Sequence, residues 1–129
     1  MKSIKIILTL LVTGAIFTAF TPSSGIDELI TALRAGNSSQ VARFFDNTVE
    51  ITMPDKSNSY SKSQAELVLK DFFINNPVKN FEVIHKGENA GSQFCIGTLF
   101  TKAGAYRTTV FMKQKGDRQL LQELRFETQ

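Results

Sequence analysis

Cysteine and histidine are scarce in this chain of 129 residues, in which Cys95 and His85 each occur once. A single cysteine excludes an intramolecular disulfide in any compartment. With one histidine, one cysteine and no HxH or CxxC spacing, the sequence predicts no metal site. No glycine falls in a phosphate-binding motif, and we expect no cofactor. We interpret Cys95 as a small apolar residue and not as a reactive thiol.

The sequence also has no large excess of charged residues of one sign. The formal net charge is +3, but two of the 15 basic residues, Lys2 and Lys5, lie at the amino end, where no acidic residue occurs. The remaining chain carries 13 basic against 12 acidic residues, and these are scattered along it. Internal repeats, low-complexity tracts and blocks of like charge are absent from the sequence. This balance argues against a nucleic-acid partner.

Residues 1–25 have the pattern of a secretory signal peptide. Lys2 and Lys5 form a positive start, and the apolar run from Ile6 to Phe20 is short for a membrane span. Small residues place cleavage near Ser23 to Gly25. The leader lacks the cysteine of a lipoprotein. We therefore expect an exported protein, periplasmic or secreted, that contacts the membrane only through this segment, with an uncleaved anchor as the alternative.

Residues 26–129 are expected to form one domain that begins with helices and a strand. Apolar residues at helical spacing predict helices over 26–35 and 65–74, the second preceded by two overlapping capping-box patterns at Ser61 and Ser63. A short helix is expected over 39–45. Alternation predicts a strand over 48–53, followed by a loop over 56–59.

The last third of the chain predicts a four-strand antiparallel meander over 81–86, 93–101, 106–113 and 119–126. Three-residue hairpin loops, Lys102-Ala103-Gly104 and Lys115-Gly116-Asp117, are expected to fix its register. With those loops, the inner face of the sheet carries the residues Phe81, Val83, His85, Phe94, Ile96, Thr98, Phe100, Tyr106, Thr108, Val110, Met112, Leu120, Gln122, Leu124 and Phe126.

The same register predicts an apolar row on the outer face of the sheet, where water-facing strands usually carry polar residues. Its members are Ile84, Cys95, Leu99, Phe111 and Leu121. Charged residues of both signs surround it, as at the rim of an interface. We therefore expect a homodimer in which two such faces stack about a twofold axis.

The element order resembles that of the nuclear transport factor 2-like superfamily. The resemblance rests on Arg43 to Ile51, on Met53-Pro54-Asp55 and on Ser61 to Phe73 with the strands that follow. More narrowly, the chain looks like a small exported bacterial family of unassigned function. The resemblance implies an α+β fold with a strongly curved, cone-shaped antiparallel sheet, made of the meander plus one earlier strand and wrapped around the helices. A cystatin-like helix on a sheet is the alternative fold.

The resemblance also raises the question whether the protein is an enzyme, because enzymes of this superfamily such as ketosteroid isomerase place acids inside the cone. None of the predicted inner residues is acidic. The polar candidates to line a pocket there are His85, Thr98, Tyr106, Thr108 and Gln122, with Tyr60 overhanging the mouth from a loop. His85 alone would transfer protons near neutral pH. Each of these residues has an equally simple interpretation as a structural polar group.

We therefore expect a non-catalytic binding module that holds a small apolar ligand or a protein partner. One alternative is an isomerase- or hydratase-type enzyme, which requires an acid that reaches the pocket from outside the meander, such as Asp46, Glu50 or Asp55. Another is an accessory or structural subunit in which only the surface matters.

Overall fold

The computed structural model describes residues 25–129, so the predicted signal peptide lies outside the described residues except for Gly25. The described chain forms three helices and six strands. In chain order these are α2 (Gly25–Ala35), α3 (Ser38–Ala42), β1 (Phe45–Met53), β2 (Lys56–Ser61), α4 (Lys62–Asn75), β3 (Val78–Asn89), β4 (Ser92–Thr101), β5 (Gly104–Lys115) and β6 (Arg118–Thr128).

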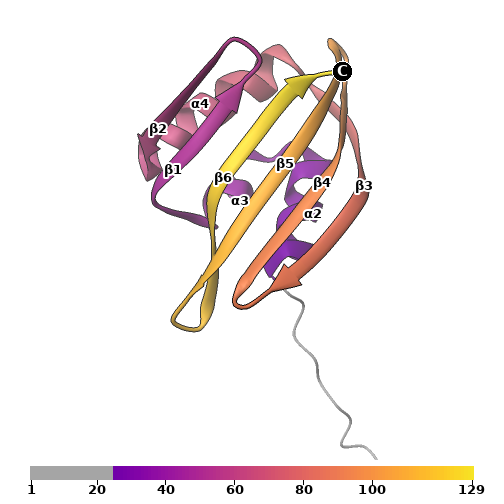
Figure 1. Ribbon diagram of the computed structural model, residues 1–129. Coiled ribbons are helices and arrows are strands. Elements are labelled where there is room, and N and C mark those ends of the chain that lie inside the picture. Colours follow the sequence, from indigo (N-terminus) through magenta and orange to yellow (C-terminus); the bar gives the residue numbers. More distant parts are fainter. Residues whose placement is uncertain (1–24) are drawn as a thin grey trace, which may run out of the picture.

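The six strands form one sheet in the order β2-β1-β6-β5-β4-β3, antiparallel except where β1 runs parallel to β6. All three helices lie on one face of the sheet, as Figure 1 shows. The sheet is twisted but not strongly curled, so the predicted cone wrapped around the helices is wrong. A single helix layer covers the inner face without requiring the sheet to close. The predicted loop over 56–59 is also wrong, because these residues belong to the edge strand β2.

Helix α2 ends as its sequence predicts. Its apolar stripe is buried, and Gly36 follows it with a φ of +64°. The amide of Gly36 donates to the carbonyl of Leu33, and the amide of Asn37 donates to that of Ala32. These two bonds form a Schellman motif, for which glycine is suited because it has no Cβ to clash in the left-handed region.

Helix α4 starts at the predicted capping box. The Ser61 hydroxyl accepts from the Gln64 amide at 3.3 Å, and the Gln64 side chain accepts from the Ser61 amide at 3.4 Å. One face of the helix buries Ala65, Leu69 and Phe73 against the sheet. The ring of Phe72 stacks on that of Phe126 in β6, with centroids 4.5 Å apart. The carboxyl half of α4 is thereby anchored to the sheet.

Strand β4 presents the opposite face from the one we predicted. The turn after Thr101 contains two residues and not three, because Thr101 pairs directly with Gly104. The Thr101 hydroxyl closes this turn by accepting from the Ala103 amide and donating to the Gly104 carbonyl. A slip of one residue reverses every side chain of a strand. Cys95 and Leu99 therefore face the helices and are fully buried.

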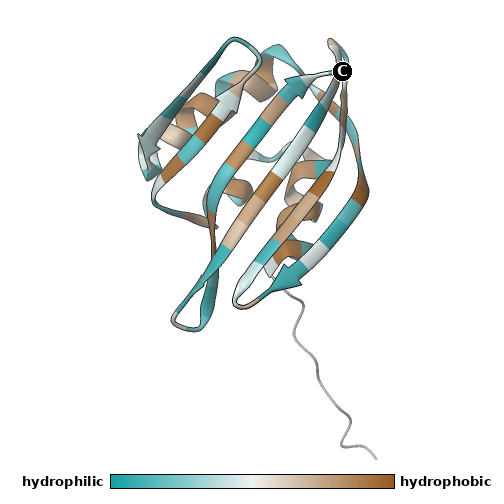
Figure 2. Cartoon of the chain, in the orientation of Figure 1, coloured by the Kyte–Doolittle hydropathy of each residue, from teal (hydrophilic) through white to brown (hydrophobic). Residues whose placement is uncertain are grey.

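The next turn is also one residue shorter than predicted, since Lys115 pairs with Arg118. A bulge at Gln122 then restores the expected face, because Phe111 pairs with Glu123 and Met112 with Leu121. Leu121 is consequently buried in place of Leu120, whereas the later residues of β6 face inward as predicted. Figure 2 shows many apolar residues along β4, and of these Phe94 lies on the outer face, directly opposite Phe111.

The close contact at Gly97 yields a stability prediction. A Cβ built there would overlap the carbonyl oxygen of Glu82 and lie 2.7 Å from Cζ of the buried Phe81 ring. We expect Gly97→Ala to lower the free energy of unfolding by about 2 kcal/mol, the usual cost of overpacking, in a urea titration.

Gly87→Ala is the matched control on the neighbouring strand. The three atoms nearest to its Cβ all belong to the partly exposed ring of Phe94, whereas the Cβ at Gly97 meets a backbone oxygen. Equal losses in the two variants would contradict the packing described for Gly97.

Candidate binding groove beside helix α4

An open groove of about 540 Å³ lies between α4 and the turn that joins β1 to β2. The middle and the carboxyl end of α4 form one wall, the turn forms the other, and the start of β5 closes one end. Its lining residues are Met53, Pro54, Asp55, Lys56, Leu67, Val68, Asp71, Phe72, Asn75, Asn76 and Tyr106. The groove brings together segments that are about fifty residues apart in the sequence.

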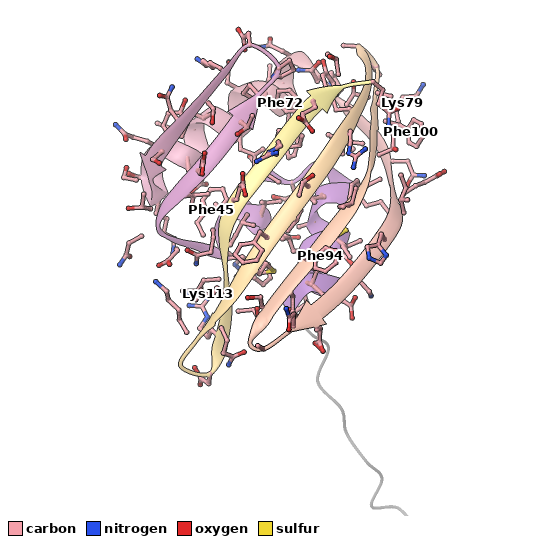
Figure 3. The ribbon with its side chains drawn as sticks, in the orientation of Figure 1. Phe45, Phe72, Lys79, Phe94, Phe100 and Lys113 are labelled. Atoms are coloured by element: carbon pink, nitrogen blue, oxygen red, sulfur yellow. The ribbon has the colours of Figure 1, made fainter. Side chains whose placement is uncertain are left out.

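Aromatic rings line the inner part of this groove. Tyr106 meets Phe72 edge to face, with ring centroids 5.3 Å apart, and Phe72 stacks on Phe126 below it. Figure 3 labels Phe72 near the end of the sheet at which β6 terminates. The Tyr106 hydroxyl donates to Asn76 Oδ1 at 2.8 Å, and the Asn76 amide groups donate to the Phe72 carbonyl. One hydrogen bond to Asn76, which is itself bonded to the end of α4, therefore holds the Tyr106 hydroxyl in place.

An exposed leucine forms the outer wall of the groove. Leu67 keeps 65% of its surface exposed although it is large and apolar. Ile74, two turns further along α4, is 64% exposed but does not line the groove. The two residues therefore differ in location and not in exposure.

The charged groups of the groove are two carboxylates and one amine. Asp55 and Lys56 come from the turn and Asp71 from α4, so the lining carries one excess negative charge. Asp71 accepts from the Asn75 side chain at 3.4 Å. Apolar walls with a few polar groups are typical of small-molecule sites. This arrangement suits a ligand with an apolar body and a hydrogen-bond donor.

The predicted pocket residues are not brought together. Tyr106 lines the groove, whereas Thr108 is fully buried and donates to the Tyr106 carbonyl. Tyr60 lies on strand β2 and not on a loop; it packs against the core outside the groove.

His85, Thr98 and Gln122 were predicted to point inward, and this is wrong. A bulge at Ile84 turns His85 to the outer face, where its ring lies 5.3 Å from that of Phe94. Thr98 shares that face because of the shorter turn, and its hydroxyl accepts from the Gln129 side chain. Gln122 sits at the bulge in β6 and donates to Asp46.

The predicted outer row is wrong in three of its five members. Cys95, Leu99 and Leu121 are fully buried, because the shorter turns move them to the face that packs on the helices. Burial also raises the pKa of the Cys95 thiol to about 11, which keeps it in the less reactive neutral form. Ile84 and Phe111 remain exposed on the sheet. Phe94 lies directly opposite Phe111 on the outer face.

Asp46 is a buried carboxylate at the start of β1, beside β6. Its Oδ2 lies 2.6 Å from Nζ of Lys115 and accepts from Gln122 at 2.9 Å, while Oδ1 accepts from the Asn47 amide. The hydrogen bond from Lys115 and those from Gln122 and Asn47 lower the pKa of Asp46 from 3.8 to about 2. Asp46 thus links three strands and is ionised at all ordinary pH values.

Within residues 25–129, no group of three or more potential ligands is placed to hold a metal ion. Over the same residues, no helix is long and apolar enough to span a membrane.

Sequence reasoning missed most of the groove. Leu67 falls outside the apolar stripe of α4, and an apolar residue on the polar side of a predicted helix was the available signal. Asp71 and Asn76 carried no signal, because their role depends on how the end of α4 meets β5.

Residues 26–127 match the family model described as Domain of unknown function (DUF4783). A DUF4783 protein from Bacteroides uniformis is 28% identical, with a TM-score of 0.77 over 80% of this chain and 95% of that one. One from Bacteroides fragilis is 29% identical, with a TM-score of 0.76 over 85% and 100%. No curated protein matches this chain.

The fold is also similar to that of an NTF2-like protein of unknown function from Cytophaga hutchinsonii. The two chains are 10% identical, with a TM-score of 0.59 over 85% of this chain and 95% of that one. At this identity the similarity concerns the fold alone, and it fits the predicted α+β class.

The low pKa of Asp46 predicts a pH-dependent contribution to stability. A pKa of about 2 in the folded state, against 3.8 when unperturbed, stabilises the fold above pH 4 by up to about 2 kcal/mol. This stabilisation is lost as the pH falls through 2. We expect Asp46→Asn to lower the free energy of unfolding at pH 7 and to flatten its decline between pH 4 and 2, measured by urea unfolding.

Asp27→Asn is the control, because it removes a carboxylate from an ion pair in which both side chains are about half exposed. That variant should cost less than about 1 kcal/mol. An Asp46→Asn protein whose stability follows the wild-type pH curve in parallel would contradict the assignment.

Proposed function

The chain belongs to the DUF4783 family of proteins of unknown function, and we propose that it is an exported, non-catalytic module that binds a small, partly apolar ligand in the groove beside α4. The observation that carries this proposal is the placement of the exposed Leu67 over a groove that contains the rings of Phe72 and Tyr106. The NTF2-like superfamily is the wider group to which we assign the fold.

Export is inferred from residues 1–25, which lie outside the described residues apart from Gly25. The two lysines and the apolar run from Ile6 to Phe20 support a cleaved leader. The DUF4783 proteins of Bacteroides support a bacterial source. We place the mature protein in the periplasm or outside the cell.

The groove favours an apolar ligand because its walls already expose apolar surface to water. Covering Leu67 and the neighbouring rings removes that surface, and each buried Å² contributes about 25 cal/mol. Tyr106 is held by Asn76, so little side-chain ordering opposes binding. The carboxylates of Asp55 and Asp71 would accept a hydrogen bond from the ligand.

The states and positions of Asp46 and Glu50 argue against an isomerase- or hydratase-type enzyme that uses either of them as its acid. A general base works best when its pKa lies near the working pH. Asp46, with a pKa of about 2 and an ion pair to Lys115, is far from that condition. The Glu50 carboxylate accepts a hydrogen bond from the Ser57 hydroxyl, and Glu50 lies beside Glu123 on the neighbouring strand β6. Glu50 does not line the groove. Of the three acids proposed for catalysis, Asp55 alone lines the groove.

Leu67→Gln tests the groove, with indole as a neutral aromatic probe that carries one donor. We expect saturable amide shifts at Leu67, Asp71 and Asn76 in a ¹H–¹⁵N NMR titration of the wild-type protein. The substitution should raise the dissociation constant about fivefold, since it removes roughly 1 kcal/mol of apolar contact.

Ile74→Gln is the matched control, because Ile74 is equally exposed on the same helix but lies outside the groove. It should leave the dissociation constant unchanged. Shifts confined to the outer face of the sheet, or equal weakening by both substitutions, would overturn the groove as the binding site.

We further propose that two copies associate through the outer face of the sheet, around Ile84 and Phe111 of the predicted row together with Phe94. Phe111 is 36% exposed and Ile84, at the bulge of β3, is 67% exposed, and Phe94 on β4 lies directly opposite Phe111. Within residues 25–129, the other exposed large apolar residues are Val83 on β3 and the two on α4. Contiguous apolar surface of this kind marks interaction sites.

Charges of both signs surround this apolar area and suit a self-complementary contact. Glu82 and Arg107 flank Thr98 across the strands, and Glu123 lies opposite Phe111. A twofold axis through the area would place acidic groups of one copy near basic groups of the other.

Phe111→Glu should give a folded monomer, because an unpaired charge would be buried at the centre of the contact. Light scattering coupled to size exclusion reads the mass, and circular dichroism reads the fold. Ile74→Glu, which adds the same charge on α4, should remain a dimer. A monomeric wild-type protein, or unfolding of the Phe111 variant, would refute the contact.

A further inference from the structure

A second cavity, of about 570 Å³, lies at the opposite end of α4 from the groove. The first residue of α4, the start of α2, the segment before β1 and the turn between β5 and β6 meet there. Its lining residues are Gly25, Glu28, Arg43, Phe44, Lys62, Asp117, Arg118 and Gln119. The cavity takes Lys62 from α4, whereas the first residue of α4 that lines the groove is Leu67, so about 7.5 Å of helix separates these two residues.

Three cations line this cavity without a carboxylate partner. Within residues 25–129, Arg43, Lys62 and Arg118 form no ion pair. Three cations elsewhere in that part of the chain each have a carboxylate oxygen within 2.7 Å. The positive groups of the cavity are therefore available to a ligand.

One of these cations is held in position over the cavity. Nη2 of Arg118 donates to the carbonyl oxygen of Arg43 at 3.1 Å, which connects the β5–β6 turn to the segment before β1. A guanidinium has five N–H donors, so four remain for another acceptor. A fixed guanidinium loses less freedom on binding an anion than a mobile one.

The shape of the cavity adds two features. Phe44, which packs partly against the core, supplies an apolar wall. Gly25 opens α2 so close to β6 that a Cβ there would lie 2.9 Å from Cβ of Gln119. The amino end of α2, with its partial positive charge, is thereby brought to the cavity beside the three cations.

The carboxylates of Glu28 and Asp117 line the same cavity. With the three cations, they give its lining a net charge of +1. These acids limit non-specific accumulation of anions. They also allow the sign of the ligand's charge to be tested. Removing an acid should strengthen the binding of an anion, whereas removing a cation should weaken it.

We propose that this cavity binds the anionic group, a carboxylate or a phosphate, of a small ligand, with Arg118, Arg43 and Lys62 as its charge partners and Phe44 as an apolar contact. The site is separate from the groove beside α4 and does not depend on the function proposed for it. Arginine suits both groups because its planar donors match two oxygens at once.

The test is a ¹H–¹⁵N NMR titration of protein expressed as the full chain, with inorganic phosphate and, separately, with N-acetylphenylalanine, at constant ionic strength set by sodium chloride. We expect saturable shifts at the amides of Arg43 and Phe44 and at the side-chain Nε–H of Arg118. Saturation by phosphate alone identifies a phosphate site, and saturation by the acetylated amino acid alone identifies a carboxylate site. Saturation by both supports the shared anion chemistry.

Arg118→Gln and Lys62→Gln should each raise the dissociation constant, the former about tenfold, and Glu28→Gln should lower it. Lys79→Gln is the control, because Lys79 is an exposed lysine on β3, outside the cavity (Figure 3). Shifts that stay linear with both probes, or dissociation constants that Arg118→Gln and Lys62→Gln leave unchanged, would overturn the proposal.

Discussion

The register of the two carboxyl-terminal hairpins is the constraint on which the rest of the structure depends. A strand presents only every second side chain to the helices, and the length of the turn decides which set that is. Two-residue turns after Thr101 and Lys115 assign Cys95, Leu99 and Leu121 to the core. The bulge at Gln122 then keeps the remainder of β6 buried on the same side. Together these features leave Phe94 and Phe111 on the outer face.

The position of α4 follows from the core that this register creates. The inward-facing Phe126 offers the ring on which Phe72 stacks, and Tyr106 completes the cluster from β5. Fixing the carboxyl half of α4 in this way leaves Leu67 beside the β1–β2 turn, which forms the apolar groove. The amino end of the helix carries Lys62 to the basic cavity at the other end. One helix therefore connects two sites of different chemistry.

The sequence predicted the elements better than their faces. Apolar spacing located α2 and α4 within a few residues, and the Ser61 capping box formed as expected. The meander was confirmed, but assuming three-residue turns reversed β4 and the first half of β6. Both sets of alternate residues in β4 contain apolar side chains, Cys95 and Leu99 in one and Phe94, Ile96 and Phe100 in the other, so alternation alone did not reveal the error. Strand β2 was missed because its polar sequence, exposed at the edge of the sheet, lacks an apolar face.

The candidate sites were less predictable than the fold, for a physical reason. Tyr106 was identified because it is a polar residue on an inward-facing position. Leu67 and Asp71 owe their importance to a turn that lies near them only in three dimensions. Arg43 and Arg118 are 75 residues apart, and their hydrogen bond depends on how β5 and β6 pair. Local pattern does not carry such information.

We propose that this protein holds a ligand in the groove beside α4 and associates with a second copy through the outer face of its sheet. Native mass spectrometry of the protein, purified without denaturation, tests both parts in one spectrum. Our account predicts a dimer that carries additional mass, which is released when the protein unfolds. A bare monomer would contradict it, because neither the apolar groove nor the outer face would then have the occupant that its exposed surface implies.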